Sequence, residues 1–210
     1  MQDTIYVISP VNRIEDISNL LKNFCCSNYD RKKLIICENG KCIGQVPRSL
    51  NINYEIVQSE ENTGLARNAC LNAVPTGSWV AHFDSDDYYG PNYINEAIPF
   101  LEEGKLISRN EYLVKTKTLG EFQFGADHPH GATLFAKKTD YRFPAIRVGE
   151  DWDLFRHYKD NWLFVPFSNS YKYIRKNYGR GNTFNATDYE LKDRAETYYE
   201  YKDRYPIIWR

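Results

Sequence analysis

Three aspartates, Asp84, Asp86 and Asp87, lie within four positions directly after the apolar stretch "SWVAHF". Two carboxylates about 5 Å apart repel each other by roughly 3 kcal/mol at an effective dielectric constant near 20, and by less than about 1 kcal/mol in water. The cluster therefore costs little in a solvated turn but requires a cation in a crevice. A divalent ion with oxygen ligands, Mg²⁺ or Mn²⁺, shared with a phosphate-bearing substrate is the natural occupant. We interpret the aspartates as a metal site, with an acidic surface turn as the alternative.

A second acidic pair, Glu150 and Asp151, lies in "GEDWDLFRHY". A carboxylate placed beside a hydroxyl group takes its proton as a general base. Acidic residues are also favoured at helix N-termini, so capping is the structural alternative and does not exclude catalysis.

The rest of the chain alternates between strand and helix patterns, which predicts the elements that position these acids. The expected elements of the first half are strands at 4–8, 33–37, 52–57 and 78–83 and helices at 14–24 and 63–74. This order is typical of an open, mostly parallel α/β sheet. The expected elements of the second half are a helix at 92–102, strands within 105–136 and 162–175, and helices at 150–158 and 188–204.

Polar residues follow every expected strand of the first half. In open α/β sheets, ligands bind beyond the carboxyl ends of the strands. The residues at those ends are Ser9 and Pro10, Glu38 and Asn39, Glu60 to Asn62, and Asp84 to Asp87. We therefore predict one site at this edge.

The segment "ENTGLARNACLNAVPTGSWVAHFDSDDYYGPNYI" (61–94) resembles the signature of family 2 glycosyltransferases of the GT-A fold. That signature has an N-x-G-x-x-x-A-R-N helix followed by a strand ending in D-x-D-D. The downstream "GEDWDLFRHY" resembles the acidic motif that supplies the catalytic base of these enzymes. The resemblance implies a single Rossmann-like open mixed sheet flanked by helices, and an inverting transferase that uses a nucleotide-diphosphate sugar, most simply a UDP-sugar.

The resemblance also implies roles for individual residues. Asp151 would be the catalytic base, with Glu150 beside it to orient the acceptor. Asp86 would be the principal metal ligand for Mn²⁺ or Mg²⁺, and Asp84 would contact the metal or the ribose. The expected donor-binding residues are Ser9, Pro10, Glu38, Asn62, Arg67 and Asp84.

Three further expectations concern the second half. Trp152 would stack on an acceptor sugar or pack in the core. His130 would bind the acceptor or face the donor sugar, or be structural. Many relatives have a later histidine near the diphosphate, but here "YKYIRKNYGR" (171–180) occupies that region. Arg175 or Arg180 would then meet the diphosphate instead.

Length and composition are consistent with one catalytic domain over 1–186, divided into a nucleotide-sugar half (1–100) and an acceptor half (101–186), and a Tyr-rich helix over 187–210. With 27 Lys and Arg against 28 Asp and Glu, a broad nucleic-acid-binding face is disfavoured, although the basic 171–180 stretch leaves a local contact open. No segment is apolar enough to span a membrane. We expect a cytoplasmic protein with a glycan or another hydroxyl-bearing acceptor, and the oligomeric state stays open.

Two other functions remain as alternatives. A nucleotidyltransferase acting on sugar phosphates also combines a parallel sheet with paired aspartates, but its usual Gly-rich loop is missing from "SPVNRIED". A non-catalytic sugar-nucleotide or glycan-binding module is expected to have lost one of the two acidic motifs, and both are intact.

Overall fold

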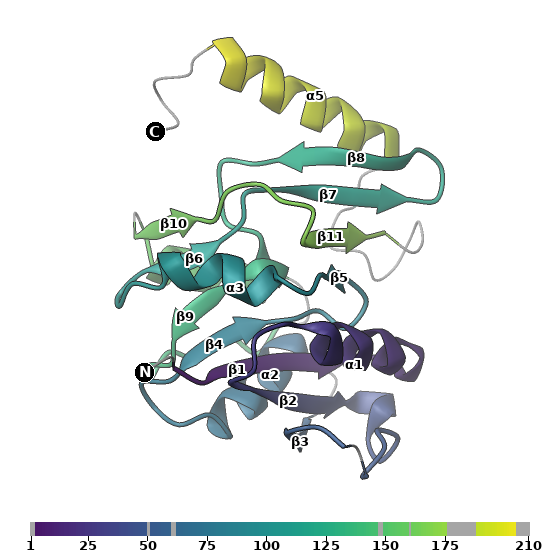
Figure 1. The fold of residues 1–210 in the computed structure, drawn as a ribbon, viewed down its shortest axis with the longest axis vertical. Coiled ribbons are helices and arrows are strands. Elements are labelled where there is room, and N and C mark those ends of the chain that lie inside the picture. Colours follow the sequence, from purple (N-terminus) through teal and green to yellow (C-terminus); the bar gives the residue numbers. More distant parts are fainter. Residues whose placement is uncertain are drawn as a thin grey trace.

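The computed structural model describes residues 3–49, 51–59, 62–146, 149–159, 161–175 and 188–204 (Figure 1). Its main sheet has seven strands in the order β10-β6-β9-β4-β1-β2-β3. These are β1 (Ile5–Val11), β2 (Lys32–Asn39), β3 (Tyr54–Ser59), β4 (Trp79–His82), β6 (Leu106–Ser108), β9 (Phe135–Lys137) and β10 (Trp162–Phe164). β1 to β4 pair in parallel, whereas β9 runs antiparallel to both neighbours. The mixed sheet confirms the predicted α/β fold class.

Successive residues of a strand point to opposite faces of the sheet. Both faces of this sheet carry apolar side chains, and helices cover both of them. Val7 of β1 packs in one core with the apolar faces of α1 (Ile17–Cys26) and α3 (Tyr93–Ala97). Its neighbour Ile8 packs in a second core with α2 (Thr63–Asn72) and α4 (Glu150–His157). Both α2 and α4 carry residues of the predicted site, so this second core holds the site in place.

The expected helix at 92–102 is shorter in the structure. α3 ends at Ala97, and the chain continues as a 3-10 turn over Ile98–Phe100. Pro99 lies at the start of that turn, and proline cannot donate the backbone hydrogen bond that continues an α-helix.

A second sheet of four strands lies beside the first, in the order β5-β11-β7-β8. Its strands are β5 (Tyr88–Tyr89), β7 (Glu111–Thr116), β8 (Gly120–Gly125) and β11 (Tyr171–Ile174). The sequence patterns predict strands here but not their separation into a second sheet. α5 (Asp188–Arg204) lies along β8 (Figure 1). The contact is close, since a Cβ atom on Gly125 would lie 2.1 Å from the ring of Tyr198.

Two further features concern membrane-spanning helices and the cysteines. In the described part of the chain, no helix is both long and apolar enough to cross a bilayer. All five cysteines are free thiols. Glu60, Glu61 and Arg180, which the sequence analysis considered, lie outside the described residues.

Candidate active site

A cavity of about 620 Å³ lies at the carboxyl ends of β1, β2 and β4, where the site was predicted. Its lining includes both acidic motifs and the two predicted acceptor-binding residues: Asp84, Asp86, His130, Glu150, Asp151 and Trp152. The segment before β9 reaches the cavity because β9 is antiparallel to β4, so the N-terminal end of β9 lies beside the C-terminal end of β4. Side chains separated by almost 70 positions in the sequence therefore share one space.

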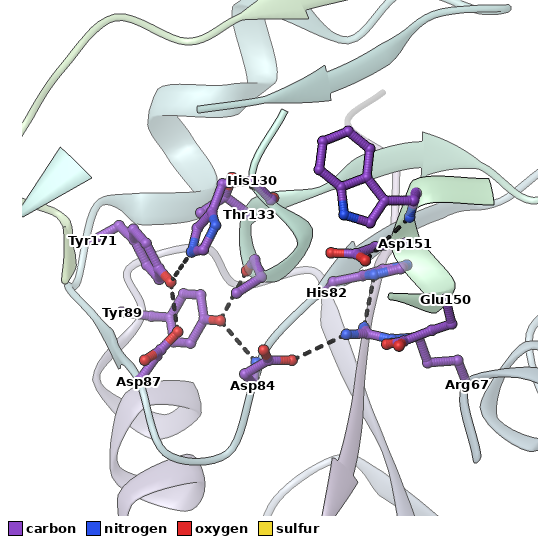
Figure 2. Close-up of polar contacts among 12 residues, drawn as sticks. Arg67, His82, Asp84, Asp87, Tyr89, His130, Thr133, Glu150, Asp151 and Tyr171 are labelled. Atoms are coloured by element: carbon purple, nitrogen blue, oxygen red, sulfur yellow. Dashed lines mark hydrogen bonds and ion pairs between the residues drawn. The ribbon is translucent and has the colours of Figure 1, made fainter. Parts of the chain in front are cut away.

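Arg67 links the two acidic motifs (Figure 2). Its Nε donates to Oε1 of Glu150 at 3.0 Å, and its Nη2 lies 3.3 Å from Oδ1 of Asp84. The side chain is 4% exposed. Burial by itself would lower the pKa of Arg67, but the carboxylates of Asp84 and Glu150 raise it above its usual value. The guanidinium is therefore permanently charged and fixed between α4 and the loop after β4.

His82, on buried strand β4, completes the contacts of Arg67. Nη1 of Arg67 lies 2.9 Å from Nδ1 of His82, and a guanidinium has only donors. Nδ1 must therefore accept, and the other ring nitrogen bonds to the backbone of Gly131. Burial and the adjacent Arg67 hold the pKa of His82 well below its usual value. The neutral histidine thus fixes Arg67 to the segment before β9, a role that sequence reasoning missed because His82 reads as part of a buried strand.

Asp151 faces the cavity from the first turn of α4. Its Oδ2 lies close to Gly131, where a Cβ atom would be only 2.0 Å away. Burial and the neighbouring Glu150 raise the pKa of Asp151, and Arg67 opposes them in part. A carboxylate with a raised pKa is a stronger base, which suits proton abstraction. Its exposed neighbour Trp152 contacts the ring of His128, with 4.9 Å between ring centroids.

Asp84 and Asp86, the two residues predicted as metal ligands, both line the cavity. Burial raises the pKa of Asp84, and Arg67 opposes this only in part. The described residues hold no group of three His, Cys, Asp or Glu side chains that would form an all-protein metal site. Two carboxylates fit a Mg²⁺-type ion, which commonly uses one or two of them together with substrate phosphates. The donor set is therefore suited to a metal that arrives with a diphosphate.

The third aspartate of the motif has a different environment. Asp87 is 1% exposed. Its Oδ2 accepts a 2.5 Å hydrogen bond from the hydroxyl of Tyr171, and its Oδ1 accepts one from the backbone N–H of Ile174 at 2.8 Å. The Tyr171 oxygen in turn lies 2.8 Å from Nε2 of His130 (Figure 2). Asp87 thus fixes the position of β11. Through the hydroxyl of Tyr171 it is also connected by hydrogen bonds to His130 on the cavity wall.

The predicted nucleotide-binding residues divide into two groups. Pro10, Asn62 and Arg67 line the cavity, and Asn62 also caps α2 by accepting from the N–H of Leu65 at 3.1 Å. Ser9 is completely buried and does not line the cavity.

Glu38, which the resemblance places among the donor-binding residues, is also absent from the cavity wall. Its carboxylate accepts hydrogen bonds from the backbone N–H groups of Gly44 and Val46 and pairs with Arg48. Asn39, the next residue, lines the cavity instead.

Arg175 is likewise turned away from the cavity. It is 6% exposed and pairs with Asp188 of α5 at 3.2 Å, so it anchors that helix. Arg194 of α5 lines the cavity in its place. Nothing in the sequence identified Arg194, because its position depends on how α5 lies along β8.

No family model and no curated protein sequence matches this chain. Among solved structures, S. aureus TarS 1-349 in complex with UDP-GlcNAc superposes with a TM-score of 0.63 at 18% identity, covering 88% of this chain and 61% of that one. A mannosyltransferase from Pyrobaculum calidifontis in complex with GDP-Man and Mn²⁺ gives 0.58 at 13% identity, covering 83% and 57%. The chain spans 60% of another TarS 1-349 structure and 37% of a longer TarS structure. This chain therefore has the GT-A-like fold of glycosyltransferases.

Proposed function

We propose that this chain is a glycosyltransferase that transfers a sugar from a nucleotide-diphosphate donor to a hydroxyl group, with inversion at the anomeric carbon. One observation carries the proposal: Arg67 joins the two acidic motifs in a single cavity, through Glu150 at 3.0 Å and Asp84 at 3.3 Å. A metal-binding pair and a carboxylate base are the two parts that such a transfer requires. The GT-A-like fold supports the same reaction class.

In the proposed reaction, Asp151 is the base. As the acceptor oxygen forms its bond to the anomeric carbon, Asp151 takes the hydroxyl proton, and the bond from that carbon to the diphosphate oxygen breaks. The nucleoside diphosphate leaves as an anion. The acceptor oxygen displaces the diphosphate in one step from the opposite face of the sugar, so the configuration inverts. Glu150 is committed to Arg67, and we assign it to positioning the first turn of α4.

Asp84 and Asp86 would hold a divalent ion, Mn²⁺ or Mg²⁺, together with the donor diphosphate. The ion would supply charge neutralisation to the leaving group. Arg67 lines the cavity but is already paired with Glu150 and Asp84, so we place its main effect on the position of these two acids. Besides Arg67, the cations that the described residues bring to the cavity wall are Arg13, Lys41 and Arg194, and these three remain for the diphosphate.

We assign a UDP-sugar as the donor, supported by the TarS structures in complex with UDP-GlcNAc and UDP. The mannosyltransferase structure contains GDP-Man, so GDP is the nucleotide whose binding should be compared with that of UDP. At the rim, the half-exposed Trp152 offers a face on which an acceptor sugar would stack, and His130 lies on the same cavity wall.

A thermal-shift panel of UDP, GDP, CDP and ADP, each with and without Mn²⁺, tests the proposal. A ligand at 100 times its Kd stabilises the fold by about 2.7 kcal/mol. We expect a shift with UDP that increases with Mn²⁺ and is lost in Asp86→Asn. Pyrophosphate release from a nucleoside triphosphate and a sugar phosphate would instead indicate a nucleotidyltransferase. Donor binding without transfer or slow donor hydrolysis would indicate a binding module.

A further inference from the structure

The ring of His130 forms one end of a hydrogen-bonded chain that starts in the buried loop after β4. Asp87 accepts from the hydroxyl of Tyr171, and the same oxygen contacts Nε2 of His130 at 2.8 Å. Tyr112 stacks on the ring, 4.2 Å away between centroids and 15° from parallel. Tyr173 contacts it edge-on at 5.9 Å. The ring is therefore fixed in both position and orientation.

The direction of the chain determines which nitrogen of His130 carries the proton. A tyrosine hydroxyl has one proton, and Tyr171 donates it to Asp87. Its oxygen can then only accept from His130, which requires a proton on Nε2. Because burial lowers the pKa of His130 to about 3, the ring is neutral near pH 7 and Nδ1 keeps a free lone pair.

We propose that His130 is a specificity residue whose Nδ1 accepts a hydrogen bond from a hydroxyl group of the sugar, and that Tyr171 and Asp87 are positioning residues that fix its tautomer. This inference rests on the proposed function for the identity of the ligand, but not for the tautomer.

A neighbouring acid on the cavity wall favours a neutral sugar as the ligand of His130. Asp151 lines the cavity beside Gly131, the residue that follows His130, and its carboxylate accepts hydrogen bonds when ionised. A neutral sugar, rich in hydroxyl donors, complements two neighbouring acceptors, Nδ1 of His130 and this carboxylate. A carboxylated or phosphorylated sugar would bring further acceptors and negative charge to the same place.

The first test is independent of any ligand. Side-chain ¹⁵N NMR of the ligand-free protein reports which nitrogen of each histidine carries the proton. We expect the Nε2–H tautomer for His130 in the wild type, assigned by comparison with His130→Ala, and a mixture of tautomers in Tyr171→Phe. The matched control is Tyr112→Phe, which removes a hydroxyl from a ring that touches His130 only by stacking. An Nδ1–H tautomer in the wild type would overturn the proposal, whether or not Tyr171→Phe folds.

The second test measures ligand recognition by calorimetry with UDP-GlcNAc and with UDP. We expect His130→Ala to weaken UDP-GlcNAc binding by about tenfold and to leave UDP binding unchanged. Equal weakening of both ligands, or of neither, would overturn the role of Nδ1. A wild-type protein that binds neither UDP-GlcNAc nor UDP would count against the proposed donor and against the ligand part of this inference, while the NMR result would still decide the tautomer.

Discussion

At the scale of single residues, Arg67 determines how charge is balanced in the cavity. One guanidinium faces Asp84, Glu150 and Asp151, so negative charge is in excess. This excess, added to burial, is why the pKa values of Asp84 and Asp151 are raised. Arg67 thus holds the three acids together but neutralises only part of their negative charge. A ligand that binds with a metal ion would supply the missing positive charge.

The close approach of Gly131 to Asp151 leads to a prediction about the base. In Gly131→Ala the new methyl group would collide with Oδ2 of Asp151, which forces the carboxylate to move. Since a displacement of about 1 Å can cost roughly 100-fold in rate, we expect kcat to fall by about that factor. Donor affinity should stay near the wild-type value, because the donor side of the cavity is untouched. Steady-state kinetics with separate donor titration checks this, and an unchanged kcat would remove Asp151 from the role of base.

The raised pKa of Asp151 leads to a prediction about pH. Proton abstraction needs the ionised carboxylate, so kcat/KM should rise with pH through a pKa above the 3.8 of an ordinary aspartate. Glu150→Gln removes a negative charge that raises this pKa, so the acid limb should move to lower pH. A pH–rate profile of both proteins provides the measurement. A limb that stays in place would mean that another group controls it.

At the scale of elements, the loop after β2 is held by a buried acid. Burial would raise the pKa of Glu38, but the hydrogen bonds from Gly44, Gln58, Val46 and Arg48 outweigh it and lower the pKa from 4.5 to about 2. Ionised Glu38 therefore stabilises the fold above pH 4.5, and this contribution is lost as the pH falls through about 2.

We expect Glu38→Gln to reduce the free energy of unfolding by about 3 kcal/mol at pH 7, which corresponds to a pKa lowered from 4.5 to about 2. The difference between mutant and wild type should shrink between pH 4.5 and pH 2. Urea unfolding at several pH values measures it, with the exposed acid variant Glu103→Gln as control. A difference that is constant with pH would contradict the ionised role of Glu38.

Sequence patterns identified the elements of the first half and both acidic motifs, because each depends on local residue types: apolar alternation in β1 and β2, and carboxylates next to Trp79–His82 and in the first turn of α4. They did not identify the partners of Glu38, His82 or Tyr171. These partners lie 6 to 84 positions away in the sequence, and only packing decides which of them meet. The contribution of Arg194 from α5 was missed for the same reason.

At the scale of the whole molecule, the two sheets share one apolar core. Ile5 and Val7 of the main sheet belong to the same buried cluster as Tyr112, Phe124 and Tyr171 of the second sheet. The cluster also includes Leu191 and Ala195 of α5. The predicted nucleotide-sugar and acceptor halves are therefore joined by common packing.

We accordingly expect the two sheets to unfold in one transition. Native-state hydrogen exchange should give the same highest opening free energy for amides of β1 and β2 as for amides of β7 and β11. Far-UV circular dichroism and exchange measured across a urea series would check it. A second sheet that opens at a clearly lower free energy would establish two folding units.

The reversed direction of β9 has a consequence for how such a protein is altered by design. Strands that run with the rest of the sheet deliver to the cavity the residues that follow them, whereas β9 delivers those that precede it. Residues 126–130 are therefore a place where length and composition can be varied without changing the register of any strand. A library built there would change the shape of the cavity wall around His130 and retain the acids that we propose to bind the metal, whereas the same library placed after Lys137 would leave this wall unchanged.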